Sequence, residues 1–196
     1  MPRYQRRLPH WDSIGEPLFV TFRLHESLPQ GRVFPPASVD SGQAFVAVDR
    51  LLDLARSGPF FLRQEEIAQM VVSAIRDGEE QLNRYRVHAF VVMPNHVHMM
   101  ATANVAASKW LGALKGFTGN QANQLLKRSG PFWQGESYDH LVRGPTEFDR
   151  IRRYIENNPV TAGLVSTPEA WPWSSASPTW WKHEAEQANV GRGFAR

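Results

Sequence analysis

Residues 85–103, YRVHAFVVMPNHVHMMATA, contain two apolar stretches that a Pro-Asn pair separates. Valine and other apolar side chains dominate both stretches, which is typical of strands with little contact with water. Proline and asparagine are frequent turn residues, and a connection this short reverses the chain tightly. The segment therefore predicts two adjacent strands in a hairpin, and any fold proposed for this chain must contain them.

Apolar periodicity and helix-ending residues predict the remaining elements. A strand is expected at 18–24, followed by a Pro/Gly/Ser-rich loop over about 27–42. Helices are expected at 43–56, 63–77, 108–128 and 145–159, and a short strand within 131–143. The resulting order is β-α-α-β-β-α-β-α. It predicts an α+β protein with a ferredoxin-like (RRM-like) antiparallel sheet, helices packed on one face, and a C-terminal extension.

Particular residues set the expected helix ends. Ser108 and Thr146 can each accept a hydrogen bond from a free backbone N–H at a helix N-terminus. Gly78 is expected to stop the second helix, and Pro159 to close the last one. Asn158 precedes this proline, which disfavours helical geometry, so we expect it at the edge of the last turn.

Length and composition limit the class of protein. At 196 residues the chain suits one domain, placed at 1–180 with a basic arm at 1–12, and a polar tail at 181–196. No apolar run approaches the roughly 18 to 20 residues that cross a bilayer, and no signal-peptide core follows the basic start. The chain has no cysteine, which excludes disulfides and thiolate metal sites. We expect a cytoplasmic protein without a membrane segment.

His96 and His98 are separated by one residue on the second strand of the hairpin. Alternate residues of a strand point to the same face, so the two imidazoles share a face about 7 Å apart along the strand. Two imidazoles on one face can bind a single divalent ion and leave coordination positions open. Equally, both could be buried histidines bonded to backbone carbonyls.

Tyr154 and Asn158 are four residues apart in RRYIENNP and hence lie on one side of the predicted helix. Phe148, Ile151 and Ile155 form the apolar stripe that would dock this helix on the sheet. Tyr154 lies beside the stripe, so its hydroxyl could emerge at the sheet edge. Taken alone, the pair also fits a core tyrosine followed by a helix-terminating asparagine.

A histidine pair on a strand, followed by a helix with Tyr-x-x-x-Asn, resembles the HUH single-tyrosine transposases. It resembles most closely the REP-associated tyrosine transposases. The likeness covers nearly the whole chain in order, through MPNHVH (93–98), GPFWQGESYDHLVR (130–143) and RYIENNPVTAGLV (153–165), with LPHWDSIGEPLFVTFRL (8–24) and WPWSSA (171–176) in support.

The resemblance implies roles for particular residues. His96 and His98 would be metal ligands, Tyr154 the nucleophile, and Asn158 the residue that completes the metal site, where mobile relatives carry glutamine. The implied reaction cuts single-stranded DNA beside imperfect hairpins, the repetitive extragenic palindromes, through a 5′-phosphotyrosine. Mg²⁺ or Mn²⁺ is the expected ion. A phenol with a pKa near 10 needs such a cation, or basic groups, to react as phenolate at neutral pH.

If DNA is the substrate, as the resemblance implies, lysine and arginine side chains are the expected contacts to its phosphates. Net charge is only +3, yet lysine and arginine are clustered, and such clusters can contact phosphates or simply form a solvated surface. The candidate phosphate contacts are Arg3, Arg6, Arg7, Lys115, Lys127, Arg128, Arg150, Arg152 and Arg153. Trp110 and Phe117 are expected to pack in the core rather than stack on bases.

Several alternatives stay open at this point. Tyr138, in GESYDH, is a rival nucleophile. A protein that binds DNA or RNA hairpins without cutting them, or a metal-dependent hydrolase without a covalent intermediate, would fit much of the same pattern. We favour a monomer over a homodimer, since the Trp-rich C-terminal extension could occupy a pairing surface.

Overall fold

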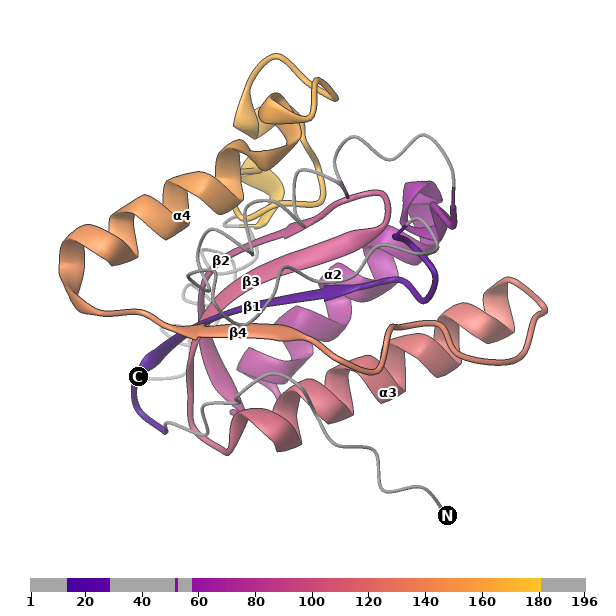
Figure 1. Ribbon diagram of the computed structural model, residues 1–196, viewed down its shortest axis with the longest axis horizontal. Helices are drawn as coiled ribbons and strands as arrows, with labels where there is room; N and C mark the ends of the chain where they lie inside the picture. Colours follow the sequence, from indigo (N-terminus) through magenta and orange to yellow (C-terminus); the bar gives the residue numbers. More distant parts are fainter. Residues whose placement is uncertain (1–13, 29–51, 53–57, 181–196) are drawn as a thin grey trace, which may run out of the picture.

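The computed structural model describes residues 14–28, 52 and 58–180. In this part of the chain one antiparallel sheet has the order β2-β3-β1-β4 (Figure 1). Its strands are β1 (Pro17–Arg23), β2 (Tyr85–Val92), β3 (His96–Ala103) and β4 (Tyr138–Leu141). Helix α2 (Glu65–Glu80) connects β1 to β2, and α3 (Ala107–Leu125) connects β3 to β4. This is the ferredoxin-like arrangement, so the predicted α+β class and sheet are confirmed.

The predicted hairpin forms β2 and β3. The backbone N–H of Met93 donates to the His96 carbonyl across the turn at 2.8 Å. Strand β1 lies on the other side of β3, so β3 is an interior strand with neighbours on both edges. In this register Thr21 of β1 is directly opposite His98, and the structure thus determines which β1 side chains meet the histidine pair.

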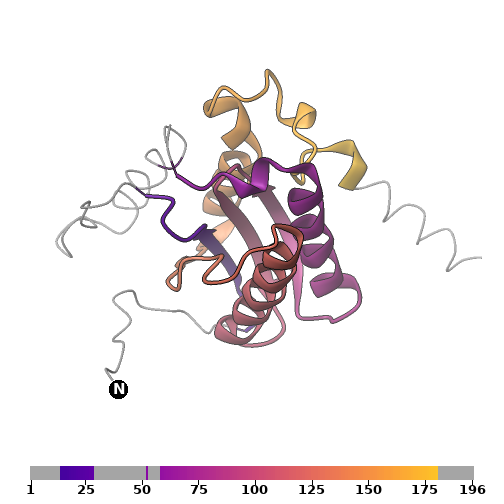
Figure 2. The same cartoon turned by 90° about the vertical axis from the view of Figure 1, so that its right-hand side faces the viewer.

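Helices α2 and α3 cover one face of the sheet (Figure 2). Val20, Val97 and Met99 of the sheet pack there against Ile75 and Trp110 of the helices, all buried. These apolar contacts form the larger of two core clusters in the described residues. Burial of apolar side chains on this scale is the main stabilising term for such a layer.

Both helices differ from the sequence prediction at their ends. Helix α2 continues past Gly78 to Glu80, and a Cβ at position 78 would overlap the Tyr85 hydroxyl. That glycine allows close packing and does not end the helix. Helix α3 begins at Ala107 after Ala106, so the prediction of Ser108 as N-cap was wrong.

Helix α4 (Gly144–Thr161) covers the opposite face of the sheet (Figures 1 and 2). Its Ile151 and Ile155 pack against Phe19, Val91 and Met100 in the second core cluster. The prediction that helices share one face holds for α2 and α3, whereas α4 covers the other. The physical reason is that β1, β2 and β3 carry apolar side chains on both faces, and the second face also needs cover.

The ends of α4 were also predicted incorrectly. The helix begins at Gly144 after Arg143, so Thr146 lies inside the first turn and is not the N-cap. It continues through Pro159 to Thr161, although a proline inside a helix has no N–H to bond the carbonyl four residues earlier. Asn158 is therefore helical, and its carbonyl accepts from the Ala162 N–H at 2.9 Å.

The segment after α4 runs along the outer edge of β2. The Val92 N–H donates to the Trp173 carbonyl at 2.8 Å, and the Ser175 N–H to the Phe90 carbonyl at 3.0 Å. Trp180 packs its ring on Phe90 at 4.5 Å between centroids. These bonds pair an otherwise open strand edge.

Some expectations fall outside the described residues: the arm at 1–12, the tail at 181–196 and, apart from Leu52, the helix at 43–56. No helix in the described part is long and apolar enough to cross a membrane. Phe117 was expected in the core but is 52% exposed, whereas Trp110 is buried as predicted.

Candidate active site

His96 and His98 turn their rings toward each other on the face that α4 covers. Their Nε2 atoms are 3.1 Å apart, and their ring centroids 4.6 Å. The strand spacing alone would separate these side chains by about 7 Å. The imidazoles therefore lie closer together than the strand spacing alone predicts.

The outer nitrogens of both rings are hydrogen-bonded. Asn95 Nδ2 donates to the Leu52 carbonyl at 3.0 Å, which directs its Oδ1 at His96 Nδ1, 2.7 Å away. His96 Nδ1 must then carry the proton, and its Nε2 presents a lone pair to His98. Thr21 Oγ1 lies 2.7 Å from His98 Nδ1 and can accept from it in the same way. Such outer bonds orient the histidines of metal sites.

This donor set fits a divalent ion. Two nitrogens that each lie about 2.1 Å from one ion at a right angle are about 3 Å apart, which matches the His96–His98 separation of 3.1 Å. With both Nδ1 atoms protonated, two lone pairs would face each other, and a cation between them removes that repulsion. No group of three or more His, Cys, Asp or Glu gathers in the described residues.

The ring of Tyr154, on α4, lies beside His98 of this pair, and the two ring planes are tilted by 55°. Its ring centroid lies 5.6 Å from that of His98. Phe19 contacts both, with centroids 5.7 Å from His98 and 6.3 Å from Tyr154. The Tyr154 hydroxyl oxygen is buried although the residue as a whole is only half-buried. A strand residue and a helix residue 56 positions apart in the chain thus meet at one point.

Asn158 follows Tyr154 by one turn of α4 and is 2% exposed. Its buried amide oxygen has the chemistry of a hard-cation ligand. Glu156 lies between them in sequence and approaches Ser175 at 3.4 Å. Burial raises the pKa of Glu156, partly opposed by the charge of Arg152 and the Ser175 hydrogen bond.

The histidine pair is closed to solvent in this structure, since His96 and His98 are both 0% exposed. The Tyr154 hydroxyl oxygen is also covered. Neighbouring groups must move before a phosphodiester can reach these atoms. Catalytic contacts commonly tighten only in the substrate complex.

Tyr138 lies on β4, on the same sheet face. Its ring centroid is 6.2 Å from that of Phe19, whose ring also lies beside Tyr154. The neighbouring His140 Nε2 lies 3.1 Å from Glu147 Oε1 and fixes the turn between β4 and α4. The Tyr154 ring lies beside a histidine of the pair, with its centroid 5.6 Å from that of His98.

The candidate phosphate contacts do not form one surface. Arg150, Arg152 and Arg153 are exposed on α4, whereas Lys127 lies at the end of α3, across the sheet. Arg128 stacks on the Phe61 ring at 4.9 Å. Arg3, Arg6 and Arg7 lie outside the described residues.

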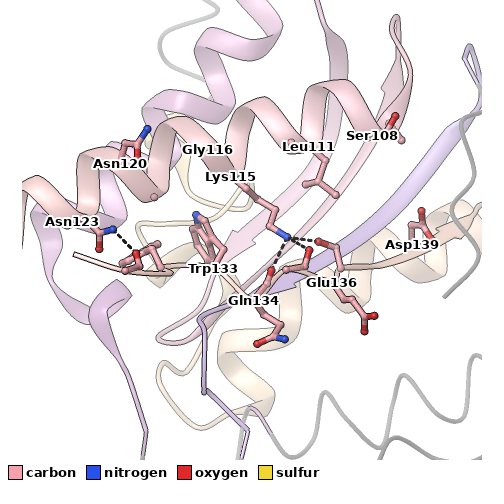
Figure 3. A pocket seen from close by; sticks show the side chains of 17 residues that line it. Ser108, Leu111, Lys115, Gly116, Asn120, Asn123, Trp133, Gln134, Glu136 and Asp139 are labelled. Atoms are coloured by element: carbon pink, nitrogen blue, oxygen red, sulfur yellow. Dashed lines mark hydrogen bonds between the residues drawn. The ribbon is translucent and has the colours of Figure 1, made fainter. Parts of the chain in front are cut away.

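Lys115 has a different environment from the other candidates. Its ammonium donates to the Gln134 carbonyl at 2.8 Å, the Gly135 carbonyl at 3.1 Å and Ser137 Oγ at 2.8 Å (Figure 3). These bonds use all three donors and attach the 134–137 segment to α3. The same residues line a cavity of about 380 Å³, on the face of the sheet away from the histidines. The Lys115 ammonium therefore has a structural role in binding the 134–137 segment to α3. We do not propose it as a phosphate contact.

Three residues of the site were missed in the sequence. Thr21 and Phe19 meet the histidines only because β1 pairs with β3, and nothing local in the sequence shows that pairing. Asn95 could have been noticed, since it directly precedes His96 in the hairpin turn and carries an amide.

The chain is similar to known proteins in sequence and in fold. A family described as "Transposase IS200 like" matches residues 61–158, half of the chain, and this span includes both histidines, Tyr154 and Asn158. No curated protein matches the chain. A solved structure described as a REP-associated tyrosine transposase bound to a REP hairpin has a similar fold, with a TM-score of 0.54 and 20% identity over 100% of this chain and 89% of that one.

Proposed function

The chain belongs to the IS200-like transposase family, and on that premise we propose that it cuts and rejoins single-stranded DNA beside palindromic hairpins. The main support for this proposal is the position of Tyr154, whose ring centroid is 5.6 Å from that of His98. His98 belongs to a histidine pair whose Nε2 atoms are 3.1 Å apart. A hairpin-binding protein that never cut DNA would not need this arrangement. The similar fold of a hairpin-bound REP-associated transposase supports the same substrate class.

The proposed reaction is a transesterification at phosphorus. The Tyr154 oxygen loses its proton and attacks the phosphate, and the bond from phosphorus to the 3′-oxygen breaks. The DNA end downstream becomes a 5′-phosphotyrosine, and the leaving 3′-oxygen takes up a proton. A 3′-hydroxyl reverses the step and rejoins DNA, so no ATP is consumed.

His96, His98 and Asn158 would hold the ion. A bound Mg²⁺ or Mn²⁺ would polarise the phosphate and favour the phenolate form of the tyrosine. The side chains around it have separate tasks. Thr21 and Asn95 hold the imidazoles with their Nε2 atoms inward, and Phe19 keeps Tyr154 against His98.

DNA would approach over α4, where Arg150, Arg152 and Arg153 are exposed near Tyr154. Lys127 and Arg128 at the end of α3 would contact another part of the strand or the hairpin. Arg3, Arg6 and Arg7 remain proposed contacts to a hairpin stem. Such contacts fix the DNA in position without reading its sequence. A DNA substrate places the proposed activity in the cytoplasm, at the nucleoid.

The test uses a 3′-labelled single-stranded oligonucleotide with a 5′ hairpin, incubated with the protein and Mg²⁺ or Mn²⁺. A denaturing gel should show a covalent protein–DNA adduct. Tyr154→Phe should abolish the adduct, and Tyr138→Phe, the matched control, should retain it. The reverse pattern would make Tyr138 the nucleophile. Cleavage that persists in Tyr154→Phe would indicate a hydrolase, and binding without cleavage in either metal would indicate a hairpin-binding protein.

A further inference from the structure

Arg63 lies at the end of the short helix η1 (Phe61–Arg63), directly before α2. Its guanidinium carbon is 4.5 Å from the centre of the Phe60 ring, and the residue is exposed. Arg63 also lines a small cavity, about 30 Å³, together with Asn95 and His96. A short chain segment far from β3 in sequence thus brings an arginine to the same small cavity as His96.

Three arginines in the described residues stack on aromatic rings, and their polar contacts differ. Arg76 stacks on Trp180 and also bonds to the Trp180 carbonyl and Glu80. Arg128 stacks on Phe61 and bonds to the Pro131 carbonyl. The Arg63 guanidinium stacks on Phe60 and makes no hydrogen bond or ion pair with the described part of the chain. Its five N–H donors are oriented by the ring and are not used by the described part of the chain.

The surroundings of Arg63 favour an anion. None of the described residues that line the cavity is acidic, and Met93, Pro94 and Leu164 form much of its wall. A space of about 30 Å³ admits one water-sized group, such as a phosphate oxygen. A planar guanidinium stacked on a ring pairs well with phosphate, because its fork can bind two oxygens at once.

We propose that Arg63, on Phe60, is a phosphate-binding residue that contacts one DNA phosphodiester adjacent to the one at the histidine pair. This inference rests on the proposed function. It adds a contact for the DNA strand that is separate from the exposed arginines of α4. Arg63 binds and positions the strand. It takes no part in the transfer of the phosphoryl group.

The test measures equilibrium binding of a single-stranded hairpin oligonucleotide to the full chain carrying Tyr154→Phe, which prevents cleavage. Arg63→Ala and Arg63→Lys are compared with Arg86→Ala. Arg86 is also exposed and is opposite Thr102, six residues from His96 along β3 and hence about 20 Å away. Each affinity is measured over a range of salt, with DNA in which single phosphates are replaced in turn by neutral methylphosphonate.

Arg63→Ala should bind about tenfold more weakly, with a salt slope reduced by about 0.7, the value for one contact on single-stranded DNA. Arg63→Lys should keep most of the slope, and Arg86→Ala should resemble the parent. Methylphosphonate at one position should weaken DNA binding by the parent protein but should not weaken binding by Arg63→Ala any further. If Arg63→Ala matches Arg86→Ala in slope and in the scan, the inference is overturned and the proposed function stands. If the parent itself fails to bind the DNA, both are overturned.

Discussion

The Nε2 atoms of His96 and His98 lie 3.1 Å apart, and the Nδ1 atom of each ring is hydrogen-bonded to a different side chain. His96 is bonded to Asn95 in the hairpin turn, and His98 to Thr21 on the neighbouring strand β1. The inward position of these nitrogens therefore depends on bonds made by side chains that need contact neither a metal nor DNA. Removal of one such bond should weaken the metal site.

Thr21→Val should weaken Mn²⁺ binding about 10- to 100-fold, the usual effect of removing a bond that orients a metal histidine. Valine keeps the shape and removes the hydroxyl 2.7 Å from His98 Nδ1. Isothermal titration calorimetry measures the affinity. Thr102→Val is the matched control, because it removes a 2.8 Å bond to His88 on the same sheet face. Equal affinities for the two variants would contradict the assignment of His98 as a ligand.

Gly78→Ala and Gly112→Ala should change stability in opposite directions. A Cβ at position 78 overlaps the hydroxyl of Tyr85, which donates to the Ile75 carbonyl at 3.1 Å, so a loss of about 1–3 kcal/mol is expected. Gly112 has nothing within 4 Å of a Cβ, so alanine should add about 0.5–1 kcal/mol through helix propensity. Urea unfolding measures both, and a stabilised Gly78→Ala would refute the packing role of that glycine.

Glu147→Gln should lower stability at neutral pH and have less effect in acid. Burial alone would raise the pKa of Glu147. The backbone N–H of Arg143 at 2.6 Å, the bond to His140, and the charges of His140 and Arg150 together lower that pKa below its ordinary 4.5. The stabilising contribution is complete above about pH 4.5 and is lost as the pH falls through the lower, folded-state pKa.

At pH 7 the Glu147→Gln variant should be less stable by about 0.5–1.5 kcal/mol, the value of a typical hydrogen bond. Thermal unfolding from pH 3 to pH 7 measures the difference, with Glu66→Gln in the first turn of α2 as the charge-matched control. A stability difference that grows as the pH falls below 4.5 would contradict a lowered pKa for this carboxyl.

The protein should sediment as a monomer. Residues 171–175 pair with the outer edge of β2 through the Val92–Trp173 and Ser175–Phe90 bonds, so that edge is not available to a second chain. Ser175→Pro removes one donor from this pairing and should produce concentration-dependent association. Sedimentation velocity at several concentrations measures both proteins, and a dimer of the unaltered chain would show that another surface pairs.

The hairpin at 85–103 could be predicted from sequence because burial on both faces leaves strong local patterns. The shared face of His96 and His98 followed from the two-residue repeat of a strand. Helix ends were predicted less well, since Gly78 and Pro159 do not stop their helices. At Gly78 the close packing of Tyr85 from β2 outweighs intrinsic helix propensity.

The amino-acid sequence alone determined the elements, their order and the residue types available for chemistry, because these depend on local spacing and polarity. The tertiary structure decided which of them meet. Only strand pairing brings Thr21 to His98, only the packing of α4 brings Tyr154 to the same ring, and only η1 brings Arg63 to the cavity at His96. These contacts join segments far apart in the chain, and their energy comes from burial and strand bonding that no single segment encodes.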